Sequence, residues 1–132
     1  MHKQGAQALA PFDLGADLCT PGEDFASPDK LRMVPDQVAR LEREIDAMNE
    51  KLGALTSFIL PGGTPAAAQV HLARTITRRA ERTLFALAAV EPVNSVALQY
   101  VNRLSDHLFV LGRALNTATG DVLWQPGATR GE

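Results

Sequence analysis

Apolar residues recur at gaps of three, four, three and four positions between residues 38 and 52. They are Val38, Leu41, Ile45, Met48 and Leu52. This spacing places side chains on one face of an α-helix, and the charged residues between them fall on the opposite face. Pro35 suits the first turn of such a helix. We therefore predict an amphipathic helix that begins near Pro35 and buries one narrow stripe in a helical bundle.

Two longer helices are predicted downstream and a short one upstream. Thr64 can cap free backbone N–H groups ahead of Pro65, so one helix should run from there to about Ala89. Its expected buried side comprises Val70, Ala73, Ile76, Ala80, Leu84 and Leu87. Asn94 is a plausible cap for the last helix, whose expected buried side comprises Val96, Ala97, Tyr100, Val101, Leu104, Leu108, Leu111 and Leu115. With a short helix at 11–19, the chain is predicted to be one all-α domain over residues 1–132.

Composition excludes several classes of protein. The chain has one cysteine, Cys19, so it cannot form an internal disulfide; we expect a small buried side chain in a reducing, cytoplasmic setting. The longest apolar run, 84–90, is far shorter than the roughly 18 residues of a membrane span. A net charge of −2 with 5% aromatic residues provides no broad basic face. Neither a membrane nor a nucleic acid is expected as a partner.

Positive charge is nevertheless concentrated in the segment 74–82. Four arginines and Glu81 give it a local charge of +3, counted as four positive side chains minus one negative. Arg74, Arg78 and Arg82 stand four positions apart and therefore stack along one helix face. Two interpretations remain open at this point. The row is either a solvated face paired with Glu81 or, if partly enclosed, one wall of a polyphosphate site.

Three other features have both a structural and a functional interpretation. The apolar loop 55–63 can close the end of the bundle, or its Phe58 can form a wall for a ligand. Asn102, Arg103 and Asp106 lie on adjacent helical turns and can bind a sugar, a metal-bound phosphate or each other. The tail 121–127 contains a tryptophan outside any helical period, which we expect to fold back onto the bundle or a neighbouring subunit.

Five ordered blocks, at residues 12–18, 58–63, 73–82, 102–106 and 121–124, resemble the PduO-type ATP:cob(I)alamin adenosyltransferases. The resemblance covers about residues 12–127 and leaves 1–11 as a divergent N-terminal segment. It implies an up-and-down helical bundle of the cobalamin adenosyltransferase type, assembled as a homotrimer with active sites between subunits.

The resemblance also implies an activity and its residues. Such enzymes transfer the 5′-deoxyadenosyl group of ATP, bound with Mg²⁺, to cob(I)alamin and release tripolyphosphate. Phe58 matches the aromatic residue on the corrinoid side that excludes the dimethylbenzimidazole base, and with Arg78 it is the predicted catalytic pair. The nucleotide side is predicted to comprise Arg74, Arg78, Glu81, Asn102, Arg103 and Asp106. No residue is assigned as a direct metal ligand.

One departure from the family pattern concerns the N-terminal region. Family members begin with a glycine- and threonine-rich phosphate-binding stretch and a long first helix, which have no counterpart before Phe12. We therefore expect an N-terminally truncated bundle, in which Arg74 lacks the acidic partner that the family places in that region. The chain would then be a fragment or a genuine short form. The alternatives to an enzyme are a non-catalytic corrinoid-binding or assembly module and a generic helical interaction protein.

Overall fold

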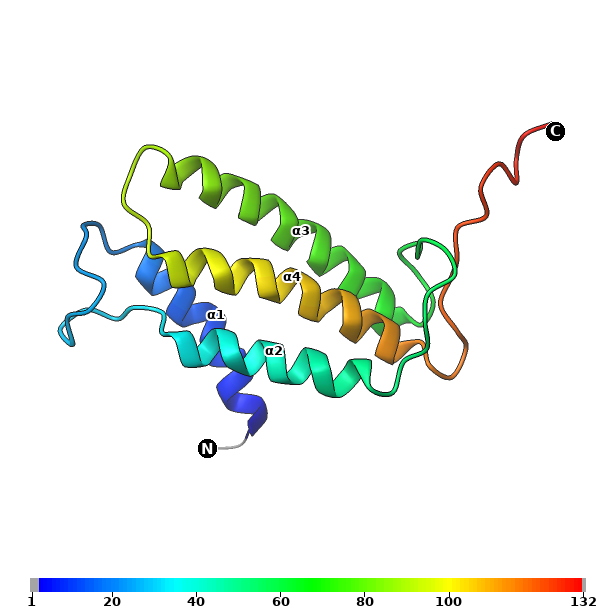
Figure 1. Cartoon of the computed structure of the whole chain (residues 1–132), viewed down its shortest axis with the longest axis horizontal. Coiled ribbons are helices and arrows are strands. Elements are labelled where there is room, and N and C mark those ends of the chain that lie inside the picture. The colour runs from blue at the N-terminus through cyan, green and yellow to red at the C-terminus, as the bar shows by residue number, and fades with distance from the viewer. Residues whose placement is uncertain (1–2, 132) are drawn as a thin grey trace.

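The computed structural model describes residues 3–131, with side chains from residue 9 onward. Within that range the chain forms four helices, α1 (Lys3–Leu18), α2 (Pro35–Asn49), α3 (Pro65–Ala88) and α4 (Ser95–Leu115). Helices α2 and α4 run in one direction and α3 runs back in the other (Figure 1). The only β pairing in the described part is a single bridge between Ile59 and Leu123. The predicted all-α, up-and-down bundle is confirmed.

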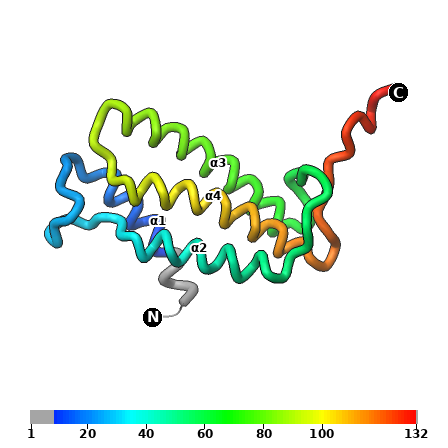
Figure 2. Tube along the Cα trace, in the orientation of Figure 1, coloured from blue at the N-terminus to red at the C-terminus, as the bar shows by residue number. Residues whose placement is uncertain are grey.

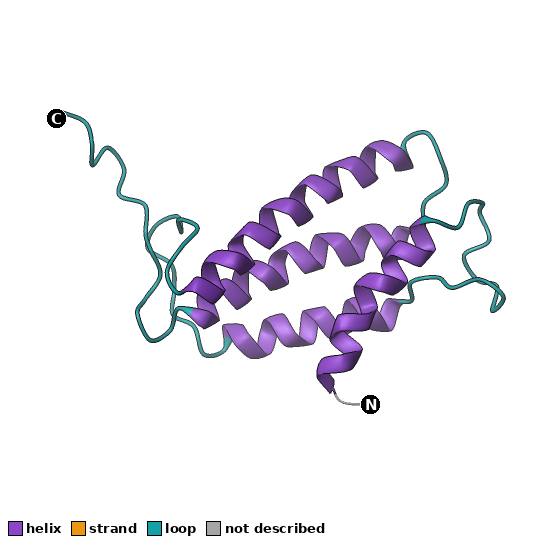
Figure 3. Ribbon diagram, turned by 180° about the vertical axis from the view of Figure 1, so that it is seen from behind, coloured by secondary structure: helices purple, strands orange, loops and turns teal. Residues whose placement is uncertain are grey.

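Helix α4 is the middle of the bundle. Helices α3 and α2 pack along two of its sides, whereas α1 crosses the bundle obliquely and touches α4 only briefly (Figure 3). The core between α2 and α4 consists of Met33, Val38, Leu41, Ala97 and Tyr100, with partly buried leucines of α1 against it. The predicted apolar stripe of α2 is confirmed: Val38 and Leu41 are buried, and Ile45 and Met48 are half-buried on the same helix face.

The predicted helix starts are confirmed by the cap geometry. The Oγ1 of Thr64 accepts a hydrogen bond from the Ala67 N–H at 3.2 Å, and Pro65 opens α3. The side chain of Asn94 accepts from the Val96 N–H at 3.1 Å at the start of α4. Each cap satisfies a backbone donor that has no partner within its own helix.

Helix α1 is longer than the sequence predicted. It begins at Lys3 and contains Pro11, which was expected to open a helix at 11–19. Proline lacks one N–H donor and crowds the turn before it, but helix can continue on both sides when the neighbouring residues favour it. Cys19, at the end of α1, is exposed, so the expectation that it would be buried is wrong.

The buried face of α3 also differs from the prediction. Ile76 is 51% exposed and Ala80 is exposed, whereas His71 and Glu81 are buried. The face toward α4 is rotated by roughly a third of a turn from the apolar face chosen from the sequence. Gly112 of α4 explains the position of His71, because its missing side chain leaves the space that the His71 ring fills. Glu81 accepts a hydrogen bond from Asn102 of α4, which holds it toward that helix.

A buried ion pair ties α1 to the rest of the molecule. Arg32 Nη1 donates to Asp17 Oδ1 at 2.9 Å, and both side chains are almost fully enclosed. Asp17 Oδ2 also accepts from the Met33 N–H at 2.7 Å and from Asn94 Nδ2 at 2.8 Å. The end of α1, the 19–34 connection and the start of α4 are thereby joined at one end of the bundle.

The loop 55–63 and the tail 121–124 meet at the opposite end of the bundle (Figure 2). The loop precedes α3 and the tail follows α4, so both emerge from the packed α3–α4 pair. In the described part of the chain, no helix is long and apolar enough to cross a bilayer.

Candidate functional site

Five of the predicted site residues form one connected set of side chains across α3 and α4, which we call the polar chain. It consists of Arg78, Glu81, Asn102, Arg103 and Asp106. Arg78 Nη1 donates to Glu81 Oε1 at 3.1 Å, and Asn102 Nδ2 donates to Glu81 Oε2 at 3.3 Å. Arg103 Nε donates to Asn102 Oδ1 at 3.1 Å, and its Nη2 lies 3.5 Å from Asp106 Oδ2. The structure thus brings these residues together from two helices.

Burial is uneven along the polar chain. The side chain of Glu81 is 12% exposed, whereas those of Arg78 and Arg103 are 46% and 40% exposed. The enclosed Glu81 carboxylate therefore holds one donor of the exposed Arg78 guanidinium and leaves its other donors for a ligand. Asn102 and Arg103 also line a hollow of about 440 Å³ together with Val38, Phe85 and Leu98. The arrangement can orient arginine donors toward an anionic ligand.

Arg74 and Phe58 lie in a separate apolar pocket beside the polar chain. This pocket has a volume of about 740 Å³ and is lined by Leu55, Thr56, Ser57, Phe58, Ile59, Arg74, Phe109 and Trp124. The guanidinium carbon of Arg74 lies 5.0 Å from the centroid of the Phe109 ring. Its Nε is buried and has no hydrogen-bond partner in the described part of the molecule. Arg74 therefore faces the pocket of Phe58, one helical turn before Arg78.

The apolar pocket is built by pairing the loop with the tail. The Trp124 N–H donates to the Phe58 carbonyl at 2.8 Å, and the Leu60 N–H donates to the Val122 carbonyl at 2.7 Å. The rings of Phe58 and Trp124 have centroids 5.8 Å apart and are tilted by 51°. Phe58 is 75% exposed, so it stands off the core and fits a ligand wall better than a plug of the bundle end. The tail folds back, as predicted, and does so onto this loop.

His71 is a packed residue between α3 and α4. Its ring lies against Gly112, and its Nε2 has no hydrogen-bond partner among the residues described. Burial lowers the pKa of His71, and the charge of Arg74 lowers it further, whereas Asp121 opposes this effect. A neutral ring is therefore favoured. The His71 ring therefore contributes to the packing of α3 against α4.

Comparison with known proteins identifies the family of the chain. The model of the family described as cobalamin adenosyltransferase matches residues 7–115. The chain belongs to the cobalamin adenosyltransferase family. The corrinoid adenosyltransferase of Mycobacterium tuberculosis strain H37Rv is 48% identical over 121 residues, which cover 90% of this chain and 62% of that protein. The corrinoid adenosyltransferase of Bacillus subtilis is 41% identical over 121 residues, covering 89% and 60%.

Solved structures agree with this assignment. A variant of the PduO-type ATP:corrinoid adenosyltransferase from Lactobacillus reuteri, complexed with cobalamin and ATP, superposes with a TM-score of 0.78 at 39% identity. The superposition covers 92% of this chain and 67% of that one. The chain spans about three fifths of the length of the curated adenosyltransferases that it matches.

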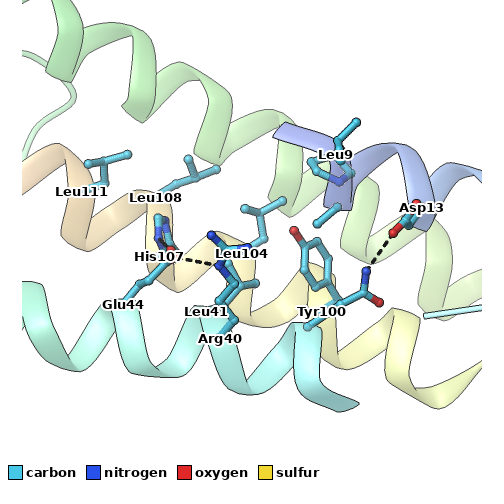
Figure 4. A pocket seen from close by; sticks show the side chains of 13 residues that line it. Leu9, Asp13, Arg40, Leu41, Glu44, Tyr100, Leu104, His107, Leu108 and Leu111 are labelled. Carbon is cyan, nitrogen blue, oxygen red and sulfur yellow. Dashed lines mark hydrogen bonds and ion pairs between the residues drawn. The ribbon is translucent and has the colours of Figure 1, made fainter. Parts of the chain in front are cut away.

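This adenosyltransferase-family chain has a further pocket that no sequence pattern indicated, on the side of α4 that faces α1 and α2 (Figure 4). His107 Nε2 lies 2.8 Å from Glu44 Oε2, and Arg40 Nε donates to Glu44 Oε1 at 3.1 Å. Nearby, Tyr100 is almost fully buried, and burial followed by the charge of Glu44 raises its pKa. Glu44 and His107 are 63 positions apart, so no local pattern could have paired them.

Proposed function

We propose that the chain carries the chemistry of a corrinoid adenosyltransferase, moving the 5′-deoxyadenosyl group of ATP to cob(I)alamin with release of tripolyphosphate. One observation carries the proposal within this family. The polar chain, with its outward arginine donors, lies one helical turn from an apolar pocket with an exposed aromatic wall. An anionic nucleotide and a large corrinoid ring need two such surfaces side by side.

The polar chain is proposed to hold the nucleotide. Arg78 would donate to phosphate oxygens and stabilise the negative charge that grows on the leaving tripolyphosphate, while Glu81 fixes its orientation. Asn102 and Arg103 would contact the nucleotide from α4. Mg²⁺ is bound mainly through substrate phosphates in many nucleotide sites, with one or two carboxylates nearby, and Asp106 is the more exposed carboxylate available for that role.

Phe58 is proposed to form the corrinoid side of the site. An exposed ring on a loop can cover the lower face of the corrin and keep the dimethylbenzimidazole base away from cobalt. A four-coordinate cobalt is easier to reduce to the nucleophilic state. Arg74, stacked on Phe109 in the same pocket, would add a positive charge to the wall that faces the ligand.

A homotrimer in a cytoplasmic setting completes the proposal. Exposed apolar side chains on the outer face of α3, Leu72 and Ile76, support an assembly that covers them. Size-exclusion chromatography with light scattering measures the subunit number. A monomer at all accessible concentrations would refute the trimer, and Leu72→Glu should lower the subunit number if this face is the interface.

The activity is tested by mixing the purified chain with chemically reduced cob(I)alamin and MgATP without oxygen, and by following the absorbance change as the cobalt–carbon bond forms. Arg78→Ala should lower kcat/KM for ATP at least about tenfold, because a charge-assisted contact contributes about 1.5–3 kcal/mol. Arg43→Ala, at an exposed position of α2, is the matched control and should leave it unchanged.

Phe58→Ala should lower the rate with cob(I)alamin, with Phe12→Ala as the control for loss of an exposed aromatic side chain. Complete absence of product from the wild-type chain would refute the enzymatic proposal. Retention of cob(I)alamin without product would support the alternative, a non-catalytic corrinoid-binding or assembly module.

A further inference from the structure

Asn116 joins the end of α4 to the start of α3 through both ends of its amide. Its Oδ1 accepts from the Thr64 N–H at 2.9 Å, and its Nδ2 donates to the Gly62 carbonyl at 2.9 Å. The residue is 1% exposed. A side-chain amide supplies a donor and an acceptor on one planar group, so it can bind two successive points of a backbone at once.

Gly63 is what allows this close approach. A Cβ added at Gly63 would lie 2.3 Å from Asn116 Oδ1, and the φ angle of +102° is one that side-chain-bearing residues rarely adopt. Contact with Asn116 therefore explains why position 63 is a glycine.

Asn116 also begins the tail that pairs with the loop. Its backbone carbonyl accepts from the N–H groups of Thr119 and Gly120, at 3.2 and 2.6 Å, and this turn directs the chain toward Trp124. Both partners of the apolar pocket, the loop with Phe58 and the tail with Trp124, thus depart from Asn116. The other end of the loop is held by Arg113 Nη2, which donates to the Gly53 carbonyl at 2.9 Å.

We propose that Asn116 is a positioning residue for the apolar pocket. It fixes the end of the loop, at Gly62–Thr64, relative to the start of the tail. The side-chain and carbonyl hydrogen bonds of Asn116 go to the loop, to the start of α3 and to the tail, so its effect should fall on the corrinoid side alone. The role assigned to the pocket rests on the proposed adenosyltransferase function. The structural link between Asn116 and the Phe58–Trp124 pair is independent of that proposed function.

The test substitutes Asn116→Asp, which keeps the size of the side chain but replaces the donor to Gly62 with a charged oxygen. Trp124 is the single tryptophan of the chain, so its fluorescence reports on the pocket without any substrate. We expect its emission to shift to longer wavelength and its quenching by acrylamide to rise about twofold, since a lost positioning bond exposes the ring. Asn49→Asp, at the exposed end of α2, is the matched control and should change neither.

In the activity assay, N116D should raise KM for cob(I)alamin about tenfold, equivalent to about 1.4 kcal/mol, and leave KM for ATP within about twofold. An unchanged tryptophan signal, or equal increases in both KM values, would overturn the proposal. A chain without activity would refute the proposed function only, because the fluorescence comparison still decides the role of Asn116. If circular dichroism shows that N116D does not fold, Asn116→Ser is judged by the same readouts.

Discussion

Gly112 lies in the contact between α3 and α4, where the ring of His71 fills the space that a side chain at 112 would occupy. A Cβ built on Gly112 would stand 2.7 Å from His71 Cε1 and 2.8 Å from His71 Nε2. Both distances are shorter than any carbon contact that a packed interior tolerates. Gly112→Ala is therefore expected to force the imidazole or the helices to move.

The size of the effect follows from two opposing terms. Overpacking a closed contact costs about 1–3 kcal/mol, whereas replacing glycine by alanine inside a helix stabilises it by about 0.8–1.0 kcal/mol. We expect a net loss of about 1 kcal/mol, or a fall in Tm of about 3–5 °C for a chain of this length. In a His71→Ala background the clash is absent, so the same substitution should stabilise the protein by about 1 kcal/mol.

Urea unfolding is monitored by circular dichroism for the wild type, both single variants and the double variant, at one protein concentration. The quantity of interest is the coupling energy of the cycle, expected near 2 kcal/mol. Gly15→Ala in α1 is the control, because a Cβ there meets nothing within 4 Å and only the helix-propensity gain should appear. An equal effect of Gly112→Ala in both backgrounds would refute the contact with His71 as its cause.

Three further predictions concern stability. Asp17→Asn should cost about 3–5 kcal/mol in urea unfolding, because it leaves Arg32 buried beside a neutral group, whereas Asp29→Asn at an exposed position should have little effect. Thr64→Ala should cost about 1 kcal/mol through loss of the α3 cap, and a change below a few tenths would contradict that role. Because burial lowers the pKa of His71 in the folded state, the unfolded chain binds more protons below about pH 6.5, so stability should fall as the pH drops through that range. A His71→Gln variant should show a shallower fall, and an identical slope would refute this assignment.

Local signals predicted the helices well where a cap and a spacing coincide. Thr64 before Pro65 and Asn94 before an apolar stripe each mark a helix start with a specific backbone partner, and the structure places the starts there. Helix α1 was the exception. The residues before Pro11 favour helix, but the proline is a local signal against it, and the structure continues the helix through Pro11.

In the candidate site, too, local spacing predicts some contacts, whereas others depend on how the helices pack. The spacing of Arg78 and Glu81 predicts their ion pair, since residues three apart on a helix are neighbours. The bond from Asn102 to Glu81 joins residues 21 positions apart and depends on how α3 lies against α4. Arg74 lies apart from the other predicted nucleotide-side residues because it stacks on Phe109. No sequence pattern singled out Phe109.

By itself the sequence determined the amphipathic helices, their caps, the arginine row and the family. Each of these depends on residues that are close together in the chain or on short motifs in a fixed order. Only the tertiary structure decided which face of α3 is buried, and the reason is the absence of side-chain volume on α4. Gly112 admits the His71 ring and Asn102 bonds to Glu81, so this face of α3 turns toward α4 and apolar Ile76 turns outward. The same holds for Asn116, whose two bonds to the Gly62–Thr64 entry exist because packing brings residues more than 50 positions apart into contact.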